Sequence, residues 1–196
     1  MKILLIVISV FLFAFIMIQA YTSKSSSDIE QYRYKVIKKV DNVEIRSYAS
    51  ALFSSVKMST SKYEETANGG FRILAGYIFG GNDRGEKIAM TSPVVMEMGD
   101  SMKMSFMVPS DKEVSDLPKP NDQRVFQEQK DSTILAAIAF GGWASDEKIQ
   151  QHIEELKAVL NAHQIAFEGP FSYLGYNPPY QLVNRRNEVV VKVKLE

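Results

Sequence analysis

A long apolar segment opens the chain and separates a leader from a domain of alternating polarity. Lys2 precedes the uninterrupted apolar run ILLIVISVFLFAFIMI (3–18), and the next charge is Lys24. A membrane-spanning helix needs about 20 residues, whereas the apolar core of a signal peptide has about 7–15. This length favours a signal anchor, with a signal peptide cleaved after Ala20 as the alternative. Under both interpretations of residues 1–20, the rest of the chain is exported to the periplasm or the extracytoplasmic face of the membrane.

Residues 21–31 are polar and are expected to form a short tether, so the folded domain is expected over residues 32–196. A period of two predicts the strands of the first half at 34–40, 43–48, 51–58, about 88–98 and 102–109. Between the third and fourth strands, apolar residues at helical spacing predict one helix within 60–80.

The second half of the domain repeats this order of elements. Its predicted strands lie near 124–129, 133–140, 171–176 and 187–195. A helix is predicted at about 146–163, with Ile149, Ile153, Leu156 and Leu160 on its apolar face. Two strand–strand–helix–strand–strand units predict an α+β fold, namely a distorted β-barrel with one helix packed on each side. The N-terminal hydrophobic helix precedes it.

Composition excludes several classes of function. The 23 basic residues balance the 23 acidic ones, which excludes the broad basic surface of a general nucleic-acid binder. Cysteine is absent, so disulfides, thiolate metal sites and cysteine nucleophiles are excluded. The two histidines, His152 and His163, are separated by about 16 Å along a helix at 1.5 Å per residue. They are therefore unable to ligate one iron together.

Four segments carry a distinctive pattern whose order and spacing span nearly the whole chain after residue 32. They are VEIRSY (43–48), GGNDRGEKIAMTSPV (80–94), FGGWASDEKI (140–149) and GYNPPYQLVNRRNEVVV (175–191). Together they resemble the SOUL haem-binding protein family. The resemblance implies two similar α+β halves in a distorted barrel, related to bacterial effector-binding domains. It also implies non-enzymatic binding of haem or another tetrapyrrole.

The resemblance also concerns the iron ligand. In the His-ligated members of the family, the proposed axial histidine lies in the first hairpin, at the position of Ser47 here. A serine hydroxyl is a poor iron ligand, so this chain is grouped with members that hold the porphyrin by apolar contacts and cations. Non-covalent haem and metal-free porphyrin are then both expected to bind. His152 and His163 are weak candidates for a single axial ligand.

The resemblance implies that the first helix forms one wall of the pocket, with Arg72 as a partner for a propionate. The methionines of the following hairpin share one face, where they either fill the core or line an apolar slot. Arg185 and Arg186 are adjacent. Arg185 either binds a carboxylate of the ligand, or one of these two arginines stabilises the final strand through an ion pair with Glu188. The expected cofactor-binding residues are Phe71, Arg72, Leu74, Ala75, Ile78, Met96, Met98, Met104 and Arg185.

A second hypothesis keeps the apolar crevice beside the first helix but changes the ligand. By resemblance to effector-binding domains, the protein would sense or carry other small hydrophobic molecules. Catalysis is not expected, because no Ser-His-Asp order, metal cluster or phosphate-binding loop is visible in the sequence. The expected partners are this ligand and, if the leader is uncleaved, the membrane around residues 3–20, with no nucleic acid.

Overall fold

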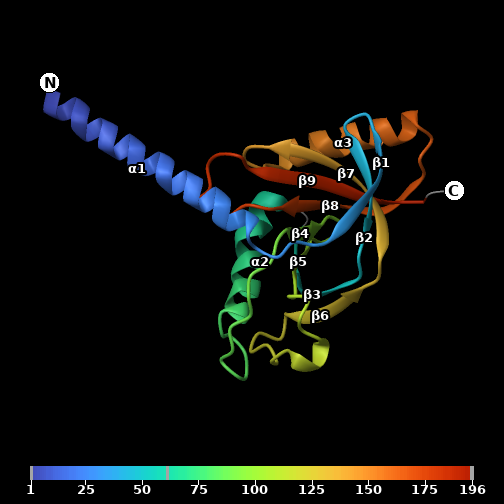
Figure 1. Ribbon diagram of the computed structural model, residues 1–196. Coiled ribbons are helices and arrows are strands. Elements are labelled where there is room, and N and C mark those ends of the chain that lie inside the picture. Colours follow the sequence, from blue (N-terminus) through green and yellow to red (C-terminus); the bar gives the residue numbers. More distant parts are fainter. Residues whose placement is uncertain (1, 61, 195–196) are drawn as a thin grey trace.

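The computed structural model describes residues 2–60 and 62–194. These residues form three α-helices, one short 3-10 helix and a sheet of nine strands. In chain order, the elements are α1 (Lys2–Ser27), β1 (Tyr34–Val40), β2 (Val43–Tyr48), β3 (Ala51–Lys57), α2 (Tyr63–Ile78), β4 (Val94–Glu97), β5 (Lys103–Met107), η1 (Val114–Asp116), β6 (Phe126–Lys130), β7 (Thr133–Gly141), α3 (Asp146–Ala162), β8 (Phe167–Gly175) and β9 (Arg186–Val193). Figure 1 shows the sheet curled into a half-barrel, with α2 and α3 beside it and α1 leading away.

The sheet combines two halves with the same internal order, β2 to β5 with α2 and β6 to β9 with α3. Its strand order is β1-β2-β7-β9-β8-β4-β5-β3-β6, and the pairings are antiparallel. The halves meet at β4 and β8, and the first strand of each half pairs with the second strand of the other. The predicted α+β barrel of two similar halves is confirmed, with β1 as an added edge strand.

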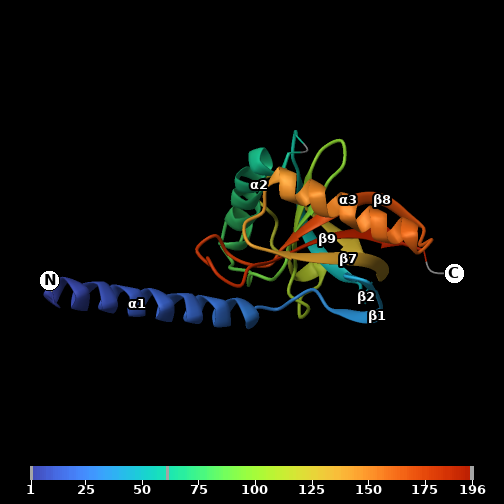
Figure 2. The same cartoon turned by 90° about the horizontal axis from the view of Figure 1, so that it is seen from above.

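The main core lies between the sheet and the two helices that cover it. Helix α2 packs against β3 and β5, and α3 packs against β7, β8 and β9; Figure 2 shows both helices across the same side of the sheet. The four residues predicted for the apolar face of the helix at 146–163, which is α3, are all buried in this core. Their burial removes apolar surface from water, which is the main force that holds a helix on a sheet.

The two helices also meet at their N-terminal ends. The Asp146 carboxylate, in the first turn of α3, accepts hydrogen bonds from the backbone N–H groups of Tyr63 and Glu64 at 2.7 and 3.2 Å. The first N–H groups of a helix have no partners within that helix. Asp146 therefore caps α2 and joins the two halves of the fold.

One predicted strand is much shorter in the structure. The strand expected at about 88–98 pairs only over Val94–Glu97, which is β4. Pro93 directly precedes it and has no N–H group to donate to a neighbouring strand. The Thr91 hydroxyl instead donates to the Met107 carbonyl at 2.6 Å. The MTSPV segment therefore connects elements and extends no strand before Pro93.

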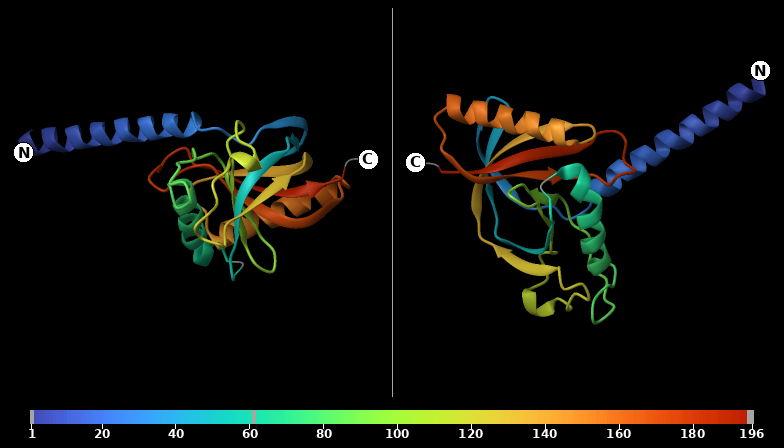
Figure 3. Two further views of the ribbon diagram at one scale, coloured as in Figure 1. Left: turned by 90° about the horizontal axis from the view of Figure 1, so that it is seen from below. Right: turned by 180° about the vertical axis from the view of Figure 1, so that it is seen from behind.

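Helix α1 continues from the apolar run into the polar residues that follow. It ends at Ser27, so much of the segment 21–31 is helical, and the remaining residues lead to β1. Extending an existing helix adds one hydrogen bond for each residue that is fixed, which favours such continuation. The segment Lys2–Gln19 is long and apolar enough to cross a membrane. Figure 3 shows α1 projecting far from the domain.

Two glycines of α2 predict opposite effects of an added side chain. At Gly70 a Cβ would lie 3.0 Å from Cε of Met104, whereas at Gly76 it would meet no atom within 4 Å. We expect Gly70→Val to lower the free energy of unfolding by about 1–3 kcal/mol through overpacking. Gly76→Ala should raise it by about 0.5–1 kcal/mol through helix propensity. Urea unfolding measures both changes, and a fully stable Gly70→Val protein would contradict the close packing of α2 on β5.

Candidate binding site on the hollow face of the sheet

The predicted pocket wall beside α2 is largely part of the closed core. Six of the nine predicted site residues belong to this core. Ala75 and Met98 are partly buried there, and the other four are at most 5% exposed. The structure therefore has core packing where an open crevice was expected, because these apolar side chains fill the space between α2 and the sheet. The predicted site residues that belong to this core are Leu74, Ala75, Ile78, Met96, Met98 and Met104.

Phe71 and Arg72 lie on the outer surface of α2. The Phe71 ring is 38% exposed and lies 5.3 Å from the ring of the buried Phe106. Arg72 is exposed, and neither residue borders the two cavities described below. These two residues offer an apolar and a cationic contact to a ligand, but on an open surface.

Arg185 is engaged within its own loop. Its guanidinium donates hydrogen bonds to the carbonyl oxygens of Pro178 and Gln181 at 2.8 and 2.7 Å. It also lies 4.2 Å from the centre of the Trp143 ring, in a cation–π contact. The structure thus gives Arg185 local partners and places it away from both cavities.

His152 and His163 lie far apart, the first within α3 and the second directly after it. The His152 ring stacks on Phe140 with 4.1 Å between centroids. His163 follows the last residue of α3, and its Nε2 lies 2.9 Å from the Asp41 carboxylate. Each histidine therefore has a local partner, and neither borders cavity 1 or cavity 2.

The face of the sheet opposite α2 and α3, which we call the hollow face, carries a second buried cluster. The Tyr32 ring, just before β1, lies 4.8 Å from the Tyr48 ring and 5.3 Å from the Phe53 ring of β3. Because β1 and β3 lie near opposite ends of the strand order, these contacts follow from the curl of the sheet. The buried members are Tyr32, Tyr48, Phe53, Val95, Met107, Ala137, Leu174, Tyr176 and Val190.

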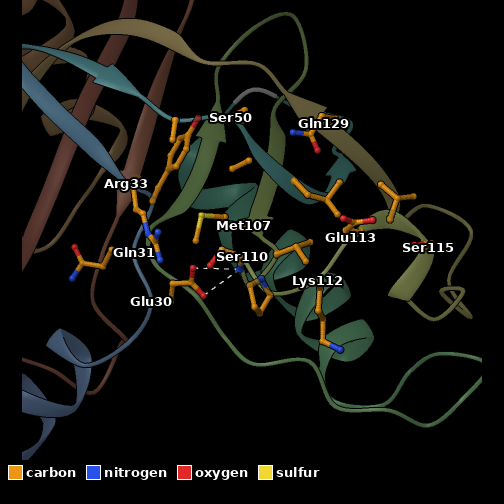
Figure 4. Close-up of a pocket in the computed structure, with 17 residues that line it drawn as sticks. Glu30, Gln31, Arg33, Ser50, Met107, Ser110, Lys112, Glu113, Ser115 and Gln129 are labelled. Carbon is orange, nitrogen blue, oxygen red and sulfur yellow. Dashed lines mark hydrogen bonds between the residues drawn. The ribbon is translucent and has the colours of Figure 1, made fainter.

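Two cavities, which we call cavity 1 and cavity 2, border Tyr32. Cavity 2 lies on the hollow face, whereas cavity 1 lies where β3 begins and β5 ends, and its lining also includes residues of the main core. Cavity 1 has a volume of about 850 Å³. Buried apolar residues, among them Leu52, Met107 and Val108, contribute to its lining. Figure 4 shows the side chains around it, with several polar groups among them. Cavity 1 therefore combines an apolar lining with polar groups.

Cavity 1 is bordered by two cations, Arg33 and Lys112, and by two carboxylates, Glu30 and Glu113. Lys112 Nζ lies 3.0 Å from the Glu86 carboxylate, and the Glu30 carboxylate accepts a hydrogen bond from the backbone of Ser110. Arg33 is exposed and forms no ion pair with any residue that the structure describes. Its guanidinium is thus available to an anionic group of a ligand.

Cavity 2, of about 780 Å³, differs in its charges. Lys130 Nζ lies 3.7 Å from Glu128 and 4.0 Å from Glu97, and Lys192 lies 3.0 Å from Glu168. Burial, with a smaller effect of the nearby Lys103, lowers the pKa of Lys130. The cations around this cavity are therefore already paired with acids, which makes cavity 2 less suited to an anionic ligand.

A buried ionic network occupies another part of the hollow face. The Arg46 guanidinium of β2 donates to both carboxylate oxygens of Glu188 in β9, at 2.8 and 3.0 Å. Arg186 donates to the same carboxylate at 2.7 and 3.0 Å, and the Tyr176 hydroxyl does so at 2.8 Å. Glu188 is completely buried. Arg186 therefore has the structural role considered from the sequence, in which an arginine stabilises the final strand through Glu188.

The network determines the protonation of its members. Burial alone would raise the pKa of Glu188, but hydrogen bonds and charge from Arg46 and Arg186 outweigh burial and hold the pKa below its usual range. Burial raises the pKa of the Tyr176 and Tyr48 phenols above their ordinary value, and it raises that of Tyr32 to about 12. At neutral pH, the acid is therefore ionised and the phenols are protonated.

A family model described as SOUL heme-binding protein matches residues 29–192 of this chain. The chain belongs to the SOUL haem-binding protein family. Heme-binding protein 2 of Mus musculus is 32% identical over 155 residues, which cover 74% of this chain and 75% of that protein. Heme-binding protein 1 of Xenopus laevis is 28% identical over 154 residues, which cover 74% of this chain and 80% of that protein.

Solved structures of low sequence identity share the fold. The C-terminal domain of EcmrR aligns with a TM-score of 0.61 at 7% identity and covers 83% of this chain and 99% of its own. A hydrolase from Listeria innocua aligns with a TM-score of 0.54 at 8% identity and covers 81% and 94%. At such low identities, these likenesses establish the architecture alone.

In this SOUL protein, Ser47 lies in β2 between Lys35 of β1 and Ile134 of β7. Its neighbours Arg46 and Tyr48 point to the hollow face, so the alternation of a strand directs Ser47 to the side of the helices. Ser47 borders neither cavity 1 nor cavity 2. A side chain at this position therefore faces away from the hollow face.

Few features of the sequence indicate the residues that border the cavities. Arg33 and Met107 lie at the ends of strands, where alternation is weakest, and the space beside them depends on the curl of the whole sheet. One signal is present in β9, where Glu188 directly precedes the apolar run Val189–Val191. A charge in a buried strand calls for a buried partner of opposite charge.

Removing one partner of the buried network should destabilise the SOUL domain strongly. We expect Glu188→Gln to lower the free energy of unfolding by about 3 kcal/mol or more, because Arg46 then loses its fully buried charged partner and keeps only its contact with the partly exposed Glu44. Glu168→Gln is the matched control, since the side chain of Glu168 is 40% exposed and its substitution should cause little change. Urea unfolding at neutral pH measures both, and equal effects of the two substitutions would contradict the network.

The same pair predicts an acid dependence of stability. The folded pKa of Glu188 lies below the ordinary value of 4.5, so the stabilisation is complete above the unfolded pKa and is lost as the pH falls through the folded pKa. Wild-type stability should therefore decrease on acidification in this window. Unfolding measured as a function of pH should show a smaller decrease for Glu188→Gln, and superimposable profiles would exclude a role of this carboxyl.

Proposed function

We propose that the protein binds haem or a related tetrapyrrole, non-covalently and without catalysis, in cavity 1. The observation that carries the proposal is a cavity of about 850 Å³ with an apolar lining and the unpaired Arg33 guanidinium, in a member of a haem-binding family. Pockets for small ligands have volumes of about 300–1,000 Å³ and combine apolar walls with a few polar groups. The relatives named heme-binding proteins support the same class of ligand.

The residues around cavity 1 match the parts of a tetrapyrrole. Leu52, Met107 and Val108 offer apolar contacts for the flat ring. Arg33 and Lys112 offer cations for its carboxylates, with Arg33 the stronger partner because Lys112 already pairs with Glu86. A bound haem would add an iron centre to these contacts.

Binding in cavity 1 does not require an iron ligand from the protein. Ser47 faces elsewhere, and the phenol of Tyr32 stays protonated because burial raises its pKa to about 12. The Met107 thioether borders cavity 1 and needs no deprotonation, so it is the first residue to substitute if haem is preferred over protoporphyrin. We therefore expect haem and metal-free protoporphyrin to bind with similar affinity.

The polar groups of the hollow face favour binding over catalysis. The buried acid Glu188 is held by two arginines and a tyrosine, and it is inaccessible to solvent. A general acid or base must reach the substrate and change its protonation near the working pH. Glu188 has neither property, so its role in this proposal is structural.

Spectroscopic titration of the purified full-length protein in detergent tests the proposal. Haem should shift its Soret band, and Arg33→Gln should weaken binding about tenfold, as expected for the loss of a charge-assisted hydrogen bond. Arg72→Gln is the matched control, because Arg72 is also an exposed arginine but lies on α2, away from cavity 1. It should leave the affinity unchanged.

The alternatives give different results in the same titration. If Arg72→Gln weakens binding and Arg33→Gln does not, the ligand lies on α2 beside Phe71, and cavity 1 is the wrong site. A strong preference for haem over protoporphyrin would contradict binding without an iron ligand, and Met107→Leu, His152→Ala and His163→Ala would identify the ligand. A non-porphyrin ligand in native mass spectrometry, with no Soret response, would assign the protein to carriers of other hydrophobic molecules.

We also propose that the domain lies outside the cytoplasmic membrane, held by α1 or released after cleavage. The apolar helix that follows Lys2 supports export. The end of an apolar span that carries a basic residue tends to stay on the cytoplasmic side, so the domain at the other end would lie outside.

A further inference from the structure

The connection between β8 and β9 reverses the usual arrangement of polar and apolar side chains. Tyr180, Leu182 and Val183 are 65%, 46% and 47% exposed, whereas Gln181 between them is 1% exposed. Loops in water normally present polar side chains, and clustered exposed apolar groups mark contact sites. We call these three apolar residues, together with Trp143, the apolar rim.

Hydrogen bonds inside the loop fix this reversed arrangement. The buried Gln181 amide donates to the Val183 carbonyl at 3.1 Å, and Arg185 donates to the carbonyls of Pro178 and Gln181. The polar groups are therefore used to brace the loop from within. Because these hydrogen bonds hold the backbone of the loop, its apolar side chains are directed outwards.

The loop is attached to α1 at one particular position. The Gln19 side chain donates to the Tyr180 carbonyl at 3.4 Å and accepts a hydrogen bond from the Leu182 backbone N–H at 2.9 Å. Gln19 is the last residue of the segment that is long and apolar enough to cross a membrane. The loop thus lies beside the point at which this segment ends, as Figures 1 and 3 show.

Trp143 extends the rim on the neighbouring connection between β7 and α3. Its ring is half exposed and stacks on Arg185, the residue that braces the loop. Tryptophan and tyrosine are enriched at the boundary between lipid and water, where their rings meet both environments. The rim contains one of each, together with two aliphatic residues.

We propose that the apolar rim rests in the interfacial layer of the bilayer crossed by α1, so that the domain has one fixed orientation on the membrane. The occupant of the rim is lipid, because the rim is continuous with the end of the apolar span through Gln19. The inference is independent of haem binding and adds a second attachment to the membrane besides α1.

Trp143 is the sole tryptophan of the chain, so its fluorescence reports on the rim directly. The full-length protein is reconstituted into phosphatidylcholine vesicles, with and without lipids brominated near the headgroup end of the acyl chains. We expect the protein to float with the vesicles, and the brominated lipids to reduce Trp143 emission.

Variants then assign the quenching to the rim. Leu182→Ser combined with Val183→Ser should reduce quenching by brominated lipid, while Ile37→Ser should not. Ile37 is the matched control, because it is an aliphatic residue of similar exposure on β1, away from α1.

Three results would overturn the inference. The first is a protein that floats with the vesicles but shows no quenching of Trp143. The second is a protein that stays out of the vesicle fraction. The third is a Trp143 signal that depends on the protein-to-lipid ratio and not on bromination, which would assign the rim to a second copy of the chain.

Discussion

The hollow face depends on the buried carboxylate of Glu188. An ionised acid in a protein core is costly unless ion pairs and hydrogen bonds replace its water, and here Arg46, Arg186 and Tyr176 supply them. Because Arg46 lies on β2 and Glu188 on β9, with β7 between them, the network ties three neighbouring strands on the side that no helix covers. The α2 and α3 side is held by apolar packing, whereas on this side the ionic network adds to the smaller buried cluster around Tyr32 and Phe53.

The sequence predicted the positions of the helices and strands better than it predicted which strands pair with one another. Alternation placed the strands, and helical spacing placed the four buried residues of α3, because both depend only on local periodicity. The exchange in which β2 pairs with β7 and β6 with β3 leaves no such local sign, since a periodic strand indicates which of its faces is buried and not which strand lies beside it. Pro93 likewise limits β4 to Val94–Glu97, because it has no N–H group to donate to a neighbouring strand, and the apolar residues around it do not indicate this.

The same limit explains why the candidate site moved from α2 to cavity 1. Leu74, Ile78 and Met104 show apolar spacing, and that spacing is identical for a side chain that fills a core and for one that lines a pocket. Only three-dimensional packing distinguishes the two, and it places these residues in the core. Cavity 1 instead combines residues from four separate segments, including the one that follows α1 and the one that follows β5. Charge then separates the two cavities, because the lysines of cavity 2 are paired with acids and Arg33 of cavity 1 is not.

The path of the chain connects cavity 1 to the leader. Between the end of α1 and Arg33, the Ser92 backbone N–H donates to the Glu30 carbonyl and the Tyr32 N–H donates to the Ser92 carbonyl, each at 2.9 Å. These bonds fix the segment that borders the cavity, while Gln19 fixes α1 to the loop before β9. The apolar span ends at Gln19 and the lining of cavity 1 begins at Glu30, so ten residues separate them, and both ends of this stretch are hydrogen-bonded to the domain. Under the proposed function, a flat apolar ligand that partitions into lipid would therefore reach cavity 1 from the side on which α1 joins the domain.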